Sequence, residues 1–356
     1  MAITGPDLRA AWRGEDLARS GAWIRTFEPA HLHEIDSALR NVRGLPLYSF
    51  GPDEFPLPRT AGVLAEIGEE LENGFGAVRL CGLDSSRYSE DELRYVFWGL
   101  GTHLGTPLYQ NGRGEIMGAV RDETRLEQPS FEPPGEGRVT SSRARARSTG
   151  PLRWHTDRCD VIALLCARNA ARGGVSKLAS IVTVYNEIER RRPDLLELLC
   201  RDYWRSRPVD EDGPVGERVF AMPVFGLQDG RITSQYSRTY VEQAQENPGP
   251  PRLTAAQNEA LDLLAAIADE VCLLSPFGAG DIQLLNNHVV YHGRTAYEDD
   301  IAFSRLLLRL WLSVPNSRRL PPGFEVLWGS TEPGALRGGV VQPGSGERAP
   351  RVLVPS

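Results

Sequence analysis

The four residues Trp154-His155-Thr156-Asp157 are the strongest local signal in this chain of 356 residues. Residues two apart on a β-strand point to the same face, so a strand here would present the imidazole of His155 and the carboxylate of Asp157 to one point in space. A His-x-Asp pair is also common by chance. The pair predicts a metal site only if a third ligand comes from elsewhere in the chain.

A third ligand is available far downstream, in the segment Asn286-Asn287-His288-Val289-Val290-Tyr291-His292-Gly293-Arg294. This segment follows a predicted strand and offers two histidines, His288 and His292. Two neutral imidazoles and one carboxylate on one face of an octahedral metal are typical of non-heme Fe(II) oxygenases, because three metal sites stay open. Zinc hydrolases more often close to tetrahedral geometry. The residues alone leave both histidines open as the ligand.

A third pattern lies in Arg305-Leu306-Leu307-Leu308-Arg309-Leu310-Trp311-Leu312. The alternation places Arg305, Arg309 and Trp311 on one face of a strand and four leucines on the other. A buried guanidinium without an anion is costly, and its planar fork matches a carboxylate with two parallel hydrogen bonds. The two arginines are therefore predicted to bind anionic groups.

Short apolar runs separated by turn residues predict a mainly-β fold with flanking helices. Capping boxes at 89–92 and 254–257 start two predicted helices, and another spans about 61–72. Asp229-Gly230 separates two strands and is typical of a type I′ hairpin. Many short strands with few long helices indicate an antiparallel barrel or jelly roll. The predicted strands are 74–83, 161–166, 175–184, 219–227, 231–236, 281–285 and 306–314.

Composition narrows the function classes. The formal net charge of −7 provides no basic field for nucleic acid or an anionic membrane. No apolar run approaches the roughly 18 residues of a membrane span, and the first residues do not resemble a secretion signal, so a cytoplasmic protein is expected. Five scattered cysteines are expected to be reduced thiols. Lys177 is the only lysine, so a bound anion must be met by arginine.

Together these patterns resemble the taurine dioxygenase-like and clavaminate synthase-like Fe(II)/2-oxoglutarate-dependent oxygenases. The resemblance covers roughly residues 74–312 and rests on three features: His155-x-Asp157, the Asn-x-x-x-x-His-Gly-Arg segment that carries His292, and the Arg-x-x-x-Arg strand that begins at Arg305. The combination is far more specific than any one of its parts.

The resemblance implies a double-stranded β-helix, a cupin-like jelly roll, with Fe(II) held by His155, Asp157 and His292. The His-Gly-Arg context favours His292 over His288. It also implies that 2-oxoglutarate chelates the iron, that Arg305 binds the distal carboxylate of 2-oxoglutarate, and that O₂ is the oxidant. Arg309 resembles the position that binds the other end of the cosubstrate or an acidic substrate group.

Further residues are candidates for the site, and each of them also has an alternative role. Ser176 resembles the position whose hydroxyl contacts 2-oxoglutarate, and otherwise it is a turn serine. Asn111 and Arg238 are candidate substrate contacts, and both also fit structural roles at the surface. The cluster of Arg143, Arg145 and Arg147 belongs either to a solvated loop or to a lid that meets an anionic substrate. His31, His33 and Glu34 are expected at the surface, outside the site.

The expected organisation follows from the same resemblance. Residues 1–73 form a helical segment packed on the core, and 74–332 form the double-stranded β-helix domain. Within that domain, about 121–150 form a lid loop, since long loops in compact domains are often functional. Residues 333–356 form a Pro/Gly-rich tail that wraps the surface.

The expected activity is hydroxylation, desaturation or cyclisation at an unactivated C–H bond of a small substrate, with release of succinate and CO₂. The substrate is expected to carry a carboxylate and to be amino-acid-like or a natural-product precursor. Halogenating relatives replace the carboxylate with a small residue, so Asp157 favours hydroxylation over halogenation. The alternatives are a metal-dependent hydrolase or lyase and a non-catalytic small-molecule-binding jelly roll. The oligomeric state is not readable from the sequence.

Overall fold

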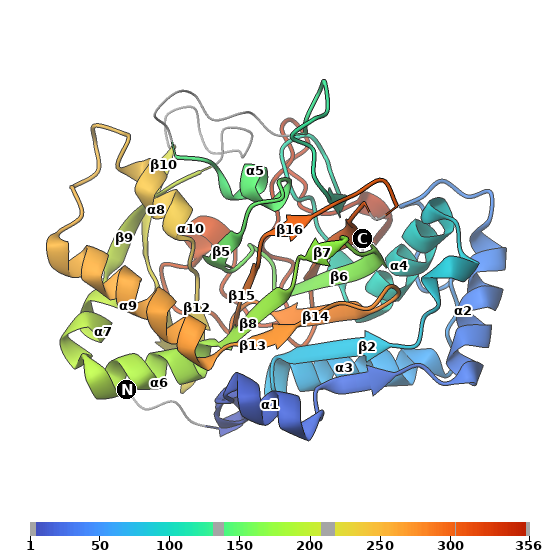
Figure 1. Ribbon diagram of the computed structural model, residues 1–356, viewed down its shortest axis with the longest axis horizontal. Coiled ribbons are helices and arrows are strands. Elements are labelled where there is room, and N and C mark those ends of the chain that lie inside the picture. Colours follow the sequence, from blue (N-terminus) through green and yellow to red (C-terminus); the bar gives the residue numbers. More distant parts are fainter. Residues whose placement is uncertain (1–4, 131–138, 208–217, 303, 354–356) are drawn as a thin grey trace.

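A central seven-stranded sheet organises the chain, whose computed structural model describes residues 5–130, 139–207, 218–302 and 304–353. The strand order is β1-β2-β14-β6-β17-β3, and β4 also pairs with β17. Figure 1 labels β2, β14 and β6 of this sheet. Neighbours are antiparallel except β1 and β2, which are parallel. The strands are β1 (Ile24–Thr26), β2 (Ala77–Cys81), β3 (Thr106–Pro107), β4 (Met117–Val120), β6 (Val161–Arg168), β14 (Ile282–Asn286) and β17 (Leu306–Ser313).

A second, four-stranded antiparallel sheet packs on one face of the central sheet, in the order β13-β8-β15-β5. Its register places His292 on β15 directly opposite His155 on β5. Strand pairing therefore brings together two of the predicted metal ligands from distant parts of the sequence. The strands are β5 (Leu152–His155), β8 (Ser176–Ser180), β13 (Leu273–Ser275) and β15 (Val290–Arg294).

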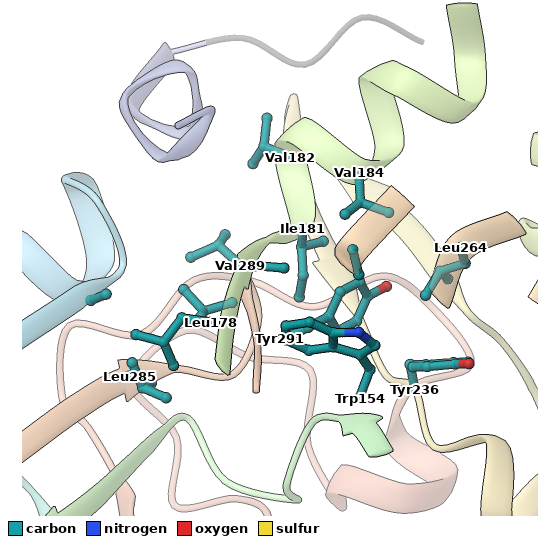
Figure 2. Packing of buried hydrophobic residues seen from close by; sticks show 14 of the residues in the cluster. Trp154, Leu178, Ile181, Val182, Val184, Tyr236, Leu264, Leu285, Val289 and Tyr291 are labelled. Carbon is teal, nitrogen blue, oxygen red and sulfur yellow. The ribbon is translucent and has the colours of Figure 1, made fainter. Parts of the chain in front are cut away.

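The two faces of the central sheet have separate cores, as the alternation in β17 predicts. Leu306 and Leu308 point into the core that the sheet shares with helices α2 (Pro29–Val42), α3 (Thr60–Asn73) and α4 (Glu90–Leu104). Leu307 and Trp311 point the other way, into the core shared with the second sheet. Figure 2 shows residues of this inner core, which include Trp154, Leu178, Ile181, Leu285 and Tyr291.

Further helices and short strands surround the two sheets. None of the described helices is long and apolar enough to span a membrane. The remaining α-helices are α1 (Gly14–Ser20), α5 (Ser142–Ala146), α6 (Ile181–Arg191), α7 (Pro193–Leu199), α8 (Arg238–Ala244), α9 (Ala255–Val271) and α10 (Glu325–Trp328). The remaining strands are β7 (Arg172–Gly173), β9 (Asp202–Ser206), β10 (Val219–Pro223), β11 (Phe225–Gln228), β12 (Arg231–Ser234) and β16 (Tyr297–Glu298), and 3₁₀ turns lie at Gly5–Ala10, Ser85–Arg87 and Arg351–Leu353.

Two local predictions from the sequence have different outcomes. Asp229 and Gly230 have φ of 52° and 75° and join β11 to β12, which confirms the type I′ hairpin. The predicted strand 175–184 is wrong in its second half, because α6 begins at Ile181. The Ser180 side chain accepts a hydrogen bond from the Thr183 amide and caps this helix. A short apolar run that is fully buried has no periodicity to distinguish helix from strand.

The C-terminal tail lies deeper than its composition predicts. Arg337 is fully buried, and its Nε donates to Asp160 Oδ1 at 2.8 Å. The other oxygen of Asp160 accepts a hydrogen bond from the Val314 amide, just after β17. A single charged pair thus fixes the tail against the turn that also carries Asp157.

Replacing Arg337 with alanine is expected to lower the free energy of unfolding by about 3–5 kcal/mol, because the substitution leaves a buried carboxylate without its cation. Urea unfolding would measure the change. The matched control is Arg319→Ala, which removes an exposed ion pair to Glu332 just before the tail and should change stability little. Equal effects of the two substitutions would contradict the prediction.

Candidate metal centre

Three predicted ligands converge at the pairing of β5 with β15. His155, Asp157 and His292 each offer one ligand atom, and these atoms all lie within 4.8 Å of one another. The Nε2 atoms of both histidines are 3.8 Å from an oxygen of Asp157. Among the described residues, this is the one group of three or more His, Cys, Asp or Glu side chains with such spacing. The arrangement can hold one metal ion and fits the iron ligand set.

The His155 ring is fixed in a form that suits a metal ligand. Its Nδ1 lies 2.9 Å from the carbonyl oxygen of Arg153. A carbonyl oxygen only accepts hydrogen bonds, so Nδ1 carries the proton and Nε2 keeps its lone pair on the side of Asp157. This contact also orients the imidazole plane.

Asp157 follows the end of β5. The prediction that strand alternation places Asp157 beside His155 is therefore wrong. Its backbone amide donates to Asn287 Oδ1 at 3.0 Å, and its Oδ2 accepts from Trp311 Nε1 at 3.0 Å. Burial opposes the charge of the carboxylate, but Arg309 and the two histidines outweigh burial and hold its pKa below the ordinary value. Asp157 is therefore an anion, as a metal ligand must be.

The structure distinguishes His292 from His288, which the residues alone left as two possible metal ligands. His292 is buried beside His155 and Asp157, and burial together with His155 lowers its pKa to about 3. It is thus neutral and needs to lose no proton to bind a metal. His288 is fully buried elsewhere, with Nε2 2.9 Å from Asp160 Oδ1. It holds the turn before β15 and does not contribute to the triad.

A cavity on one side of the triad carries Ser176, His292, Arg305 and Arg309 in its lining. Arg305 is 2% exposed, its guanidinium lies over the ring of Tyr297, and its Nε and Nη1 have no hydrogen-bond partner. The Ser176 hydroxyl accepts from the amide of Gln283 at 3.1 Å. Unpartnered buried N–H groups indicate a place for an anion, so these residues fit the carboxylate of 2-oxoglutarate.

A second cavity also borders the triad and shares His155 and Arg309 with the first. Its wall includes His155, Asp157 and Arg309, and it continues along β9. Arg309 lines both cavities, with Nε donating to Gln110 Oε1 at 2.8 Å. This position is compatible with both roles expected of Arg309, at the cosubstrate and at the substrate.

Two of the three candidate substrate contacts do not line either of these cavities. Asn111 is buried and bonds to Glu115 and to backbone amides of its own turn, while its neighbour Gln110 lines the second cavity. Arg238 pairs with Glu242 and Asp262 and lines a separate surface groove. Both residues make structural contacts, and Asn111 is buried and not at the surface.

The three clustered arginines separate in space. Arg143 lines the second cavity from α5, whereas Arg147 is 3% exposed and pairs with Glu115 at 2.6 Å. Arg145 donates to the carbonyl oxygen of Thr140. The predicted lid loop thus includes a short helix and a buried ion pair, while its residues 131–138 lie outside the described part of the chain.

His31, His33 and Glu34 belong to α2 on the outer face of the central sheet. The ring of His31 accepts a hydrogen bond from the Glu28 amide at the start of this helix. Glu34 accepts hydrogen bonds from the amides of Arg59 and Thr60. These contacts stabilise α2 and its neighbour α3, and none of the three residues belongs to the metal triad.

Comparison with known proteins identifies the family of the chain. The model of the family "Taurine catabolism dioxygenase TauD, TfdA family" matches residues 41–311. FR-33289 synthase of Streptomyces rubellomurinus is 31% identical over 343 residues, which cover 92% of this chain and 95% of that protein. Uridine-5′-phosphate dioxygenase of a Streptomyces species is 28% identical over 214 residues, which cover 54% of this chain and 77% of that protein.

Solved structures confirm the fold. Asparagine oxygenase in complex with Fe(II), 2S,3S-3-hydroxyasparagine and succinate superimposes with a TM-score of 0.60 at 16% identity, covering 82% of this chain and 93% of that one. The non-heme iron oxygenase OrfP in complex with Fe and alpha-ketoglutaric acid gives 0.56 at 16% identity, covering 82% and 94%. The predicted mainly-β jelly roll with flanking helices is confirmed. The chain therefore belongs to the TauD/TfdA family of Fe(II)- and 2-oxoglutarate-dependent dioxygenases.

Proposed function

We propose that this dioxygenase oxidises an unactivated C–H bond of a small, carboxylate-bearing molecule that is amino-acid-like or a natural-product precursor. The observation that carries the proposal is that residues of the His155, Asp157 and His292 triad line two cavities. One cavity fits the cosubstrate and the other leaves room for a substrate. The family relatives named for asparagine oxidation and FR-33289 synthesis support this substrate class.

In this proposal His155, Asp157 and His292 hold Fe(II), and Arg305, Ser176 and Arg309 hold 2-oxoglutarate. Arg305 would bind the distal carboxylate through its two unpartnered N–H groups. When both are bound, iron and 2-oxoglutarate supply an O₂-derived oxidant, and the cosubstrate leaves as succinate and CO₂. Gln283 would orient the Ser176 hydroxyl toward the cosubstrate.

The protein's own contribution is orientation. Trp311 holds one oxygen of Asp157, and the Arg153 carbonyl sets the His155 ring, so these two ligands would be held in fixed orientations for the metal. Arg294 of the His-Gly-Arg segment donates to the carbonyl oxygens of Ser148 and Gly150, which ties the chain before β5 to β15. These contacts keep the substrate-side wall in place relative to the metal ligands.

The first test is anaerobic addition of Fe(II) and then 2-oxoglutarate to metal-free protein. We expect the weak visible metal-to-ligand charge-transfer band of the chelate, and we expect His292→Ala to remove it. The control is His288→Gln, which keeps an amide donor near Asp160 and should retain the band. A folded, iron-loaded protein without the band would contradict the proposal and favour the hydrolase or binding-protein alternatives.

Arg309 lines both cavities, whereas Arg305 lines the cosubstrate cavity and not the substrate-side one, so Arg309 is expected to contact the substrate as well as 2-oxoglutarate. Arg309→Ala should raise the KM for the substrate more than the KM for 2-oxoglutarate, and Arg305→Ala should do the reverse. Steady-state kinetics with each varied in turn would measure both. Equal effects of the two substitutions would contradict this division.

We also propose a cytoplasmic location and small-molecule partners without nucleic acid or membrane. All five cysteines are free, which suits a reducing compartment. The net charge of −7 disfavours polyanionic partners.

A further inference from the structure

One side chain connects the two parts of the chain that carry the metal ligands. Asn287 lies in the turn at 287–289 between β14 and β15, five residues before His292, and it is fully buried. Opposite this turn is the loop at 156–160 between β5 and β6, which carries Asp157. The segment Asn-x-x-x-x-His-Gly-Arg begins with this asparagine, and the proposed function gives it no role.

Asn287 makes three hydrogen bonds to that loop, each at a different residue. Its Oδ1 accepts from the Asp157 amide at 3.0 Å, and its Nδ2 donates to the sulfur of Cys159 at 3.1 Å. Its own backbone amide donates to the carbonyl oxygen of Asp160 at 2.9 Å. A backbone amide only donates, so the contact with Asp157 requires the oxygen of the Asn287 side chain on this side. The orientation of the side-chain amide is thereby fixed.

The loop also has supports that do not involve Asn287. Arg337 donates to the side chain of Asp160 at 2.8 Å, and the Gly339 amide donates to the carbonyl oxygen of Arg158 at 2.8 Å. These contacts reach the residues that follow the metal ligand, whereas the backbone amide of the ligand itself is bonded to Asn287. Loss of the Asn287 side chain would therefore free the backbone of the ligand while the loop stays folded.

We infer that Asn287 is a positioning residue for the metal centre, which fixes the separation of Asp157 and His292. Its hydrogen bonds link the loop of the first ligand to the turn that leads into β15, the strand of the second. The Nε2 atom of His292 lies 3.8 Å from Asp157 Oδ2. One metal ion must reach both atoms, so a shift of the Asp157 backbone would weaken its binding. The inference rests on the proposed function for the identity of the ligands.

The test measures the Kd for Fe(II) in metal-free full-length protein under anaerobic conditions, with a competing chelator that fixes the free Fe(II). Asn287→Ala should raise this Kd by about 10- to 100-fold, the usual effect of losing a contact that orients a metal ligand. It should also shift the charge-transfer band that forms with 2-oxoglutarate. Cys159→Ala removes the sulfur that accepts from Asn287 but keeps the bond to Asp157, so it should change the Kd little.

The matched control is Asn286→Ala, which removes the neighbouring buried asparagine at the end of β14. The Asn286 side chain donates to Leu71 and Glu72 of α3 and accepts from the His288 amide, so it has no contact with the Asp157 loop. Both substitutions should lower the free energy of unfolding of the metal-free protein in urea, because each removes buried hydrogen bonds. Only Asn287→Ala should also weaken iron binding, whereas a merely structural role predicts the same Kd in both variants.

Equal Kd values in the Asn286 and Asn287 variants, or an unchanged Kd in folded Asn287→Ala protein, would overturn the inference. Asn287→Ser serves if the alanine variant does not fold, and the same two outcomes apply to it. Iron affinity is measured without 2-oxoglutarate, which separates the inference from the proposed function. If Fe(II) binding depends on Asn287 but the charge-transfer band never forms, the oxygenase proposal fails and the positioning role stands. Absence of Fe(II) binding in the unchanged protein would overturn both.

Discussion

Asp157→Ala is expected to remove Fe(II) binding and to lower succinate formation by more than about a hundredfold, since loss of contacts that merely orient metal ligands already costs about 10- to 100-fold. Asp157 is the only anion of the triad. Its removal leaves two imidazoles together with Arg309, whose Nη1 lies 3.8 Å from the present carboxylate. The site then repels a cation. Iron content after desalting and 2-oxoglutarate turnover would measure both effects.

The matched control for this substitution is Asp53→Ala, at an exposed turn position far along the chain from the triad. It should retain iron and full turnover. A non-catalytic binding protein would instead keep its ligand affinity in Asp157→Ala and show no turnover in either form. Undiminished succinate formation in a folded Asp157→Ala protein would contradict the assigned ligand set.

Arg305→Ala is expected to raise the Kd for 2-oxoglutarate by about a hundredfold, equivalent to about 3 kcal/mol for two charge-assisted hydrogen bonds. Its Nε and Nη1 are two buried donors without a hydrogen-bond partner, and Arg305 lines the cosubstrate cavity. Iron binding should persist, because Arg305 is not one of the triad residues. Titration of the charge-transfer band with 2-oxoglutarate would give the Kd directly.

Two comparisons sharpen this second experiment. Arg172→Ala removes an exposed arginine that pairs with Glu298 and should leave the Kd unchanged. Arg305→Lys keeps the charge but loses the planar fork, so it should recover only part of the affinity. A Kd that is the same in Arg305→Ala and in the unchanged protein would place the distal carboxylate elsewhere.

The residues of the metal site could be predicted because their chemistry is rare and their spacing is distinctive. His155, Asp157 and His292 were identified from one short motif and one distant segment, and the structure brings all three together. The alternation from Arg305 to Leu312 likewise predicted which residues of β17 reach each core. In both cases the information lies within a few consecutive residues.

The remaining parts depend on contacts between distant segments. Arg205 looks like any other arginine in a chain rich in arginine. Its burial without an ionic partner among the described residues emerges only when β9 and β10 pair. The predicted substrate contact Arg238 was paired by Glu242 and Asp262, of which the latter lies on another helix. The helical start at Ile181 depends on the Ser180 cap and on burial from all sides.

Strand β17 fixes the distance between two arginines that line the cavities beside the metal triad. Arg305, just before the strand, and Arg309 within it lie four residues apart, about 13 Å at the usual rise of an extended chain. The spacing between Arg305 and Arg309 is therefore set by the extended backbone of the strand, not by any loop. One inserted residue between them would turn one guanidinium toward the leucine core. New specificities should accordingly arise by exchanging side chains along this strand, never by changing its length.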